Sequence, residues 1–258
     1  MRLADLETSS RILRQYDAEM RAEPPPEPGV SRVWSGGVLR TTGLHHCIGY
    51  SDLGAADADR AIEEQIAFFR SLGVAVEWKL YGHDGPGDLA DRLARAGFRP
   101  DETEHLMVRD LDAGPIEDPA VRGISLRQVR DLDALHDYIA AGSAAFGRDE
   151  PRALARYCNR LADPSLMLVV AYDGALPVAS ARLELPPGRQ FAGLWGGGTV
   201  PSHRHRGIYQ ALVAARAWEA RWRGYRYLTV DARATSRPIL ERLGFVALTS
   251  VTGWIWQP

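Results

Sequence analysis

The second half of the chain alternates between two patterns of apolar residues. Short apolar runs bounded by turn residues predict strands, and longer runs with apolar positions three or four apart predict helices. In chain order the pattern predicts strand, helix, helix, three strands, helix, strand, helix and a final pair of strands. The predicted strands cover 123–129, 165–174, 177–185, 190–200 and 225–232, and the predicted helices cover 131–147, 150–163, 208–222 and 237–245. This order predicts an α/β fold, a mixed sheet with helices on both faces.

The first half repeats part of this order. Residues 67–98 and 217–245 both contain the end of a helix, a glycine, a strand, a helix and a Gly-Phe pair. Such self-similarity is typical of a duplicated unit. Between Asp110 and Gly123 the periodicity is lost and proline, glycine and acidic residues accumulate, as they do in linkers. The predicted parts are an N-terminal helix with a stiff proline-rich spacer (1–29), a first domain (30–115) and a second domain (120–258).

Composition narrows the class of protein. The chain has 258 residues, of which 45% are hydrophobic and 25% charged, and a formal net charge of -2, so it has no overall attraction for nucleic acid or acidic membranes. The two cysteines, Cys47 and Cys158, are too few for a disulfide framework or a four-thiolate zinc site. The charged N-terminus lacks the apolar core of a signal peptide, and no apolar run is long enough for a membrane span. We expect a cytoplasmic protein.

A basic loop, "PSHRHRG" (201–207), leads directly into an alanine-rich helical segment. A helix begins with unpaired N–H groups at its positive end, which suits phosphate oxygens. Arg204, His205 and Arg206 add charge there, and Gly207 lets the backbone approach a ligand because it has no Cβ. The loop therefore predicts a pyrophosphate site, although a solvated basic turn is the alternative interpretation.

These residues carry a resemblance to a known family. The second domain resembles the GNAT superfamily of N-acetyltransferases, in which a [Q/R]-x-x-G-x-[G/A] motif holds the coenzyme A pyrophosphate; here it reads Arg204-His205-Arg206-Gly207-Ile208-Tyr209. The late segment "PILERLGF" (238–245) is similar to a second family element. The resemblance implies tandem GNAT-like domains with a mixed, mostly antiparallel sheet flanked by helices, the first domain being degenerate, and it implies acetyl-CoA as the cofactor.

The family pattern is not matched everywhere. Tyr209 replaces a small residue at the end of the loop motif, and Leu240 stands where many members have the tyrosine that protonates the departing thiolate. The resemblance also implies that Gly197, Gly198 and Thr199 pair with the pantetheine arm. Three consecutive glycines fit a splayed or bulged strand, but a glycine-rich edge without a ligand is the alternative. The predicted cofactor-binding residues are Gly197, Gly198, Thr199, Arg204, His205, Arg206, Gly207, Ile208 and Tyr209.

Three residues are candidates for catalysis. Glu184 and Asp231 lie on strands expected to flank the acceptor cleft, where partial burial raises a carboxylate's pKa toward the working range of a base. Glu184 could equally be a solvated surface acid, and Asp231 a turn residue. Ser236 could reach the sulfur end of the cofactor or cap the next helix. His203 and His205 lack acidic or cysteine partners at ligand spacing, so no metal site is predicted.

The first domain differs where the basic loop should recur. Its counterpart, "YSDLGAADADRAIEEQI", places Asp52, Asp57 and Asp59 near the start of a helix. These carboxylates suit the helix dipole but repel a pyrophosphate, so we expect no coenzyme A in this domain. A polar segment near its middle is either a wall of the acceptor site or an ordinary loop; it contains Lys79, Tyr81, His83 and Asp84.

The sequence as a whole predicts an N-acetyltransferase. It would move an acetyl group from acetyl-CoA to a primary amine by direct attack in a ternary complex, since no cysteine or serine stands in a recognisable nucleophile motif. The acceptor is a small-molecule or peptide amine that the sequence does not identify, and neither a nucleic acid nor a membrane is expected as a partner. The protein is a monomer or a homodimer. A catalytically inactive sensor or scaffold that binds acyl-CoA is the alternative, because of Leu240.

Overall fold

The computed structural model describes residues 3–258, with side chains from residue 7 onward. The chain forms two compact units that are interleaved in sequence. The first unit contains the residues up to Met107 together with Asp231–Pro238 and Val246–Pro258, and the second contains Val108–Val230 and Ile239–Phe245. The predicted domains, 30–115 and 120–258, are each one continuous stretch of the chain, whereas each of these units also includes a separate stretch from within residues 231–258. The domain limits therefore stay a prediction.

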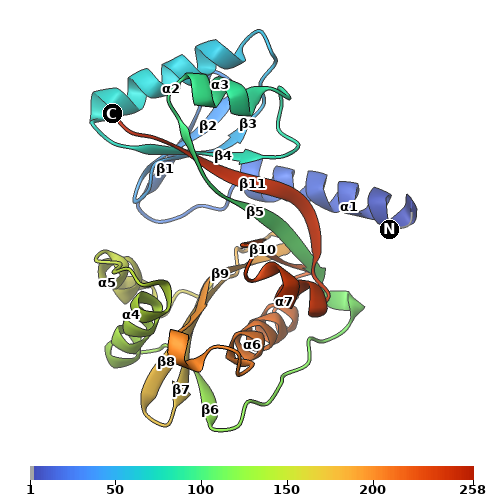
Figure 1. Cartoon of the computed structure of the whole chain (residues 1–258), viewed down its shortest axis with the longest axis vertical. Helices are drawn as coiled ribbons and strands as arrows, with labels where there is room; N and C mark the ends of the chain where they lie inside the picture. The colour runs from blue at the N-terminus through green and yellow to red at the C-terminus, as the bar shows by residue number, and fades with distance from the viewer. Residues whose placement is uncertain (1–2) are drawn as a thin grey trace. The chain divides into compact units, whose positions relative to one another are not determined.

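The first unit is a sheet with two covering helices. Its strands follow the order β1-β2-β3-β4-β11-β5, and within it β3 and β4 run parallel while β1/β2, β2/β3 and β4/β11 are antiparallel. The core between sheet and helices is centred on Trp78, Phe69 and Leu93. Figure 1 shows α2 and α3 together over these strands. The elements are α1 (Leu3–Tyr16), η1 (Asp17–Ala22), β1 (Val30–Ser35), β2 (Val38–Gly43), β3 (Cys47–Ser51), α2 (Ala58–Leu72), β4 (Val76–Tyr81), α3 (Leu89–Arg95), β5 (Arg99–Asp110) and β11 (Val246–Trp256).

The N-terminal helix continues to Ala22 as a π-helical turn, η1, which buries Arg21. One sequence prediction about this unit was wrong. The expected final strand pair is one continuous strand, β11, which pairs with β4 from Val251 to Trp256. Gly253 lies within this pairing, opposite Lys79.

The second unit has the strand order β10-β9-β8-β7-β6, antiparallel except for the parallel pair β9/β10. A helix starts at Leu132 because the Asp131 carboxylate accepts a hydrogen bond from the Ala134 N–H at 2.8 Å, and it ends at Gly147, which adopts a left-handed φ of 65°. The elements are η2 (Leu111–Ala113), β6 (Ile124–Gln128), α4 (Leu132–Phe146), α5 (Ala153–Tyr157), η3 (Cys158–Arg160), β7 (Leu166–Asp173), β8 (Leu176–Glu184), β9 (Phe191–Thr199), η4 (Pro201–His203), α6 (Ile208–Trp222), β10 (Tyr227–Ala232) and α7 (Arg237–Arg242).

Helices α4 and α6 cover opposite faces of this second sheet, as Figure 1 shows. One core lies under α4 and α5 and includes Leu135, Tyr157 and Val170, while the other lies under α6 and includes Ile208 and Leu212. Strand β9 is therefore packed on both sides, and its glycine run lies between two helices. The predicted fold class, a mixed α/β sheet flanked by helices, is confirmed.

Helix length and polarity also bear on membrane association. None of the helices in the described part of the chain combines the length and the apolar character that a membrane crossing requires.

Candidate functional site

The parallel pair β9/β10 opens part of the way along. The two strands pair at Phe191, Ala192 and Gly193, opposite Tyr227, Leu228 and Thr229, and the paired register among the described residues ends there. Strand β9 continues to Thr199 while still pairing with β8 on its other side. We call this opening the second fork. The edge of β9 that faces it has backbone N–H and C=O groups to offer, so an extended chain with amide groups can add there as a strand would.

The glycine run lies along this fork and is needed for packing. A Cβ at Gly198 would lie 2.9 Å from the Cβ of Ala145 on α4, and a Cβ at Gly197 would lie 3.1 Å from the Tyr209 ring on α6. Gly196 adopts a left-handed φ of 55°. Larger residues would push the helices away from β9, so the glycines let both helices approach a strand whose free edge lies open.

The basic loop connects the end of β9 to the start of α6. His205 and Gly207 both have left-handed backbone angles, with φ of 62° and 84°, and the second suits glycine. No side chain among the described residues caps the first turn of α6. The N–H groups of that turn are therefore not taken by a capping side chain, and they form the end of a helix dipole that attracts anions.

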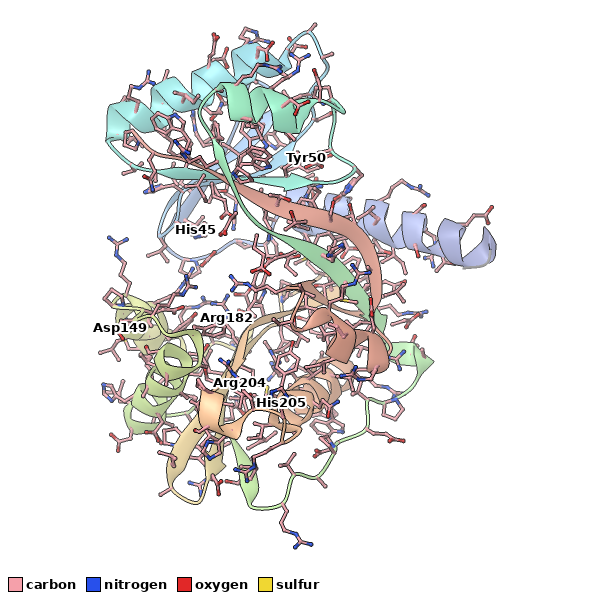
Figure 2. All side chains as sticks on the ribbon, in the orientation of Figure 1. His45, Tyr50, Asp149, Arg182, Arg204 and His205 are labelled. Atoms are coloured by element: carbon pink, nitrogen blue, oxygen red, sulfur yellow. The ribbon has the colours of Figure 1, made fainter. Side chains whose placement is uncertain are left out.

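The loop side chains mainly hold the loop in shape. The Arg204 guanidinium donates from Nε to the Thr199 carbonyl at 3.1 Å and from Nη2 to the Ala145 carbonyl at 3.0 Å. Arg206 donates to Asp173 at 2.9 Å, and this hydrogen bond lowers the pKa of the Asp173 carboxyl. Figure 2 shows Arg204 and His205 at this loop. Because both guanidinium groups already have partners, the backbone amides of the first turn are the better candidates for an anion.

The remaining predicted cofactor residues have different surroundings. Ile208 is buried in the core under α6, so only its backbone is available to a ligand. The Tyr209 ring packs against Gly197. Thr199 ends β9, and its hydroxyl is buried without a hydrogen-bond partner among the described residues. The structure thus gathers all nine predicted residues along the fork and its loop, and their role in binding stays a prediction.

A polar cluster lies beside the opening of the second fork. Glu184 is opposite Gly193 in the β8/β9 register, and Arg182 is opposite Trp195. The Arg182 side chain is 16% exposed and that of Glu184 is 39% exposed, with 3.3 Å between Nε and Oε1. The Arg182 Nη1 donates to the Tyr157 hydroxyl on α5. Burial opposes the charge of Arg182, but Glu184 and the tyrosine outweigh it and raise its pKa.

A second guanidinium lies on the other side of β9. Arg216 on α6 is 1% exposed and donates to the carbonyls of Leu212 and Arg182, both at 2.9 Å. No carboxylate pairs with it among the described ion pairs, and burial lowers its pKa to about 10. Two buried guanidinium groups near one half-exposed carboxylate give this part of the second unit a positive potential.

Sequence analysis missed both arginines as site residues. Arg216 follows Ile208 and Leu212 at four-residue spacing, on the apolar face of α6, and a charge at such a position is a signal that it has a buried role. Arg182 alternates with Leu183 on a strand, which places it with Glu184 on one face. No local pattern indicates that this face turns toward Tyr157 rather than toward solvent.

The other two catalytic candidates belong to the first unit. Asp231 accepts a hydrogen bond from Lys79 at 2.5 Å, and its second oxygen, Oδ1, is buried without a partner in the described structure. The pKa of Lys79 is raised: burial opposes its charge, but the attraction of Asp231 is stronger. The Ser236 hydroxyl donates to the Arg233 carbonyl at 3.2 Å, a local turn contact. The structure therefore brings Glu184, but neither of these two, into the second unit with the predicted cofactor residues.

The first unit contains a fork of the same kind. Strands β3 and β4 run parallel and pair at Cys47 and Ile48, opposite Glu77 and Trp78, and the paired register ends there among the described residues. We call this opening the first fork. In each unit the fork lies between two parallel strands that a helix connects along the chain: β3 and β4 through α2, and β9 and β10 through α6. This agrees with the internal repeat seen in the sequence.

Arg21 fills the first fork. Its guanidinium carbon lies 3.6 Å from the centre of the Tyr81 ring on β4 and 5.0 Å from that of Tyr50 on β3. Nη2 donates to both oxygens of Asp84, at 2.9 and 2.7 Å, and Nη1 donates to Asp17 at 2.7 Å. Burial opposes the charge of Arg21, but the Asp84 contact outweighs it and raises its pKa. The space that the second fork leaves open is here occupied by the chain itself.

The helix that follows the first fork is also unlike its counterpart. The Gly54 carbonyl accepts hydrogen bonds from the N–H groups of Asp57 and Ala58, at 3.1 and 3.2 Å, at the start of α2. Asp57 pairs with Arg60 at 2.8 Å, and Asp59 with Arg92 at 2.7 Å. The start of α2 thus has its N–H groups partly used and carboxylates around it, which disfavours a pyrophosphate.

Comparison with known proteins agrees with this geometry. Residues 132–245 match the family model described as "Acetyltransferase (GNAT) family". No curated protein sequence matches the chain significantly. Among solved structures, the chain is similar to a GCN5-related N-acetyltransferase from Kribbella flavida, with a TM-score of 0.70 and 16% identity over 98% of this chain and 95% of that one.

Two further structures are similar over nearly the whole chain. A GCN5-related N-acetyltransferase from Sphaerobacter thermophilus has a TM-score of 0.64 and 18% identity, over 96% of this chain and 85% of that one. A tandem GNAT protein from the clavulanic acid biosynthesis pathway has a TM-score of 0.61 and 14% identity, over 99% of this chain and 95% of that one. At these identities the likeness shows the fold, which is shared across both units.

Proposed function

We propose that this chain, whose residues 132–245 match the GNAT acetyltransferase family model, transfers an acetyl group from acetyl-CoA to a primary amine of a small molecule or peptide. The observation that carries the proposal is the second fork with its loop. An open strand edge leads through the basic loop to a helix start without a capping side chain, and the edge and the helix start suit the amide-containing arm and the pyrophosphate of one elongated cofactor.

Each part of the site would hold a different part of the cofactor. The backbone of Gly197, Gly198 and Thr199 would pair with the pantetheine amides, and the amides from His205 to Tyr209 would bind the pyrophosphate. Arg204 and Arg206 would add positive charge while they keep the loop in shape. The bound cofactor would supply an acetyl thioester, so the protein's own residues need to position the amine, remove its proton and hold the carbonyl.

Glu184 is the candidate base within the second unit. Glu184 pairs in register with Gly193, the last position at which β9 pairs with β10, and its side chain is exposed enough to receive a proton directly or through water. Asp231 and Ser236 stay alternative candidates from the first unit. Leu240 is fully buried and has no proton to give, so a water molecule or another group would protonate the thiolate. Direct attack by the amine in a ternary complex requires no protein nucleophile.

The proposal is tested by thiol release. Purified protein is mixed with acetyl-CoA and a panel of primary amines, free coenzyme A is measured with a thiol reagent, and the acetylated amine is identified by mass spectrometry. Release that depends on an amine supports the proposal. Tight binding of acetyl-CoA by calorimetry with no turnover across the panel would instead identify a sensor, and the absence of any binding would refute the cofactor site.

A further inference from the structure

The polar cluster beside the second fork contains two largely buried arginines, Arg182 and Arg216, to which the proposed acetyl transfer gives no role. Arg182 presents a guanidinium whose Nη1 donates to Tyr157, whereas its buried Nε lies 3.3 Å from Glu184 Oε1 in an ion pair that does not complete a hydrogen bond. A buried N–H group without an acceptor costs free energy. Such a group is commonly retained where a ligand completes its hydrogen bonds.

Aromatic rings fix the position of this guanidinium. Its central carbon lies 5.9 Å from the centre of the Tyr157 ring and 5.8 Å from that of Trp195. Tyr157 packs edge to face against Tyr138 with 5.9 Å between ring centres. Trp195 lies on β9 just before the glycine run, so the fixed guanidinium stands beside the fork rather than at its pyrophosphate end. Figure 2 shows Arg182 near α4. The group is thus held in advance for a partner of defined geometry.

The neighbouring charges restrict the partner. Glu184 is the carboxylate closest to Arg182, and Arg216 adds a second buried cation on the far side of β9. The site therefore has a net positive character with one negative group at its solvent side. A phosphate dianion next to Glu184 would be repelled more strongly than a single carboxylate, while a molecule with both an ammonium and a carboxylate would satisfy Glu184 and Arg182 together.

We propose that Arg182 binds a carboxylate of the acceptor, so that the acceptor is an amine that carries a carboxylate, as an amino acid does. This inference rests on the proposed function, because it names the substrate class of the same site. Guanidinium and carboxylate form paired, charge-assisted hydrogen bonds that fix orientation as well as affinity. Glu184 would attract the acceptor's ammonium group and take its proton before attack. Arg182 is accordingly a specificity-determining residue rather than an acid or base.

The experiment compares amines that differ only in the carboxylate. The probes are L-leucine with 3-methylbutylamine and L-phenylalanine with 2-phenylethylamine, and O-phosphoethanolamine with ethanolamine is the phosphate pair. For the wild-type protein, kcat/KM for the carboxylate member should exceed that for its partner by about tenfold or more. Equal rates for both members, or a preference for the phosphate, would overturn the inference.

Variants at Arg182 separate recognition from folding. R182Q should lower the ratio of kcat/KM for each amino acid to kcat/KM for its matched amine by about 10- to 100-fold, mainly through KM, because it removes the carboxylate's partner. The ratio is the readout because Arg182 also contacts Glu184, and an effect of that lost contact falls on both members of a pair. R182K should keep part of the preference. The matched control is R127Q: Arg127 is an exposed strand arginine of the same sheet whose guanidinium lies 5.3 Å from the Tyr172 ring centre. Coenzyme A affinity and the melting temperature verify that each variant is folded.

Failure of the proposed function gives a different result from failure of this inference. If no amine is acetylated, calorimetry with N-acetyl-L-leucine and N-(3-methylbutyl)acetamide at saturating coenzyme A still tests the site. Binding of the acid but not the amide, lost in R182Q, would support a carboxylate site in a protein without turnover. Binding of neither probe, or of both equally, would overturn the inference.

Discussion

The two forks of this molecule differ in what occupies them. Both are formed by a parallel strand pair that separates after two or three paired positions. In the second unit the open edge leads to a loop with two left-handed residues and a helix start without a capping side chain. In the first unit Arg21 enters the opening and is bound by Asp84 and Asp17. The same backbone arrangement is therefore our proposed ligand site in the second unit, and in the first unit it holds the chain's own N-terminal segment.

This difference indicates how the same strand arrangement can be completed without a ligand. An open fork leaves backbone polar groups that need a partner. In the first unit the partner is covalently attached, so its binding requires no free ligand. A buried cation held by two carboxylates and two aromatic rings lies in this opening. The first unit is expected to contribute structure, and the second to contribute chemistry.

The largest effect is expected on removing Arg21. Arg21→Met leaves Asp84, whose side chain is 3% exposed, as a buried carboxylate without its cation, and breaking a buried pair in this way costs about 3–5 kcal/mol. Denaturant unfolding of the full chain measures the loss. Arg60→Met is the matched control, because Arg60 is 58% exposed with its two partners also exposed, and its loss should be far smaller than that of Arg21→Met. Equal losses for the two variants would show that Arg21 is not an anchor.

The next largest effect is expected at the second fork. Gly207→Glu places a carboxylate at the positive start of α6 and a side chain where φ is 84°, so coenzyme A affinity should fall at least about 100-fold. Gly188→Glu is the control, since Gly188 also has a left-handed φ, of 72°, with open space around it. Calorimetry measures both.

The same titration tests the contrast between the units. Wild-type protein should bind one coenzyme A per chain, and the Gly207→Glu variant should bind none, because the first fork is filled by Arg21. A second site that survives the substitution would contradict the assignment of the first unit as free of cofactor.

The sequence predicted the second unit better than the first for a physical reason. Strands and helices from residue 123 onward follow local periodicity, and the basic loop is contiguous, so both can be read without knowing the fold. Arg21, in contrast, lies in a proline-rich stretch that indicates a spacer. Its partner Asp84 is 63 positions away, and no local pattern reports that contact. The pairing of Asp231 with Lys79, 152 positions apart, was missed for the same reason.

The sequence predicted the positions of Arg182 and Glu184 only in part. Alternation placed Arg182 and Glu184 together, but whether their face is covered depends on α5, which ends at Tyr157 rather than continuing through 163 as the sequence suggested. Tertiary packing therefore determines whether this face of β8 is covered, which the alternation of the sequence does not indicate. The class of acceptor likewise could not be predicted from the sequence, because it depends on side chains from α4, α5, β8 and β9 that meet around Arg182 only in the fold.

Low pH should lower the free energy of unfolding through Asp17, which binds Arg21 in the first fork. Burial raises the pKa of this carboxyl, but hydrogen bonds with His83 and Arg21 outweigh it, so the pKa lies below its ordinary value of 3.8. Its contribution to stability is complete above that ordinary value and is lost as the pH falls from there through the lowered native pKa. Unfolding free energy measured from pH 6 to pH 2.5 should decline less steeply in Asp17→Asn than in the wild-type protein. An unchanged slope would mean that Asp17 does not take part in the anchor.

The smallest effect is expected from Asp173, which neutralises the basic loop from outside. It accepts a hydrogen bond from Arg206 at 2.9 Å and lies 3.3 Å from His203, but its side chain is 36% exposed, so solvent and salt screen the attraction. Asp173→Asn removes a negative charge near the predicted pyrophosphate site and should raise coenzyme A affinity about two- to threefold at low salt. The gain should be lost at about 0.5 M salt, because charges then interact only over a few ångströms. The first fork provides the contrast, since buried Asp84 is essential to its cation while exposed Asp173 only moderates one. A fall in affinity in this variant would reverse that distinction and show that the loop needs Asp173 to orient Arg206.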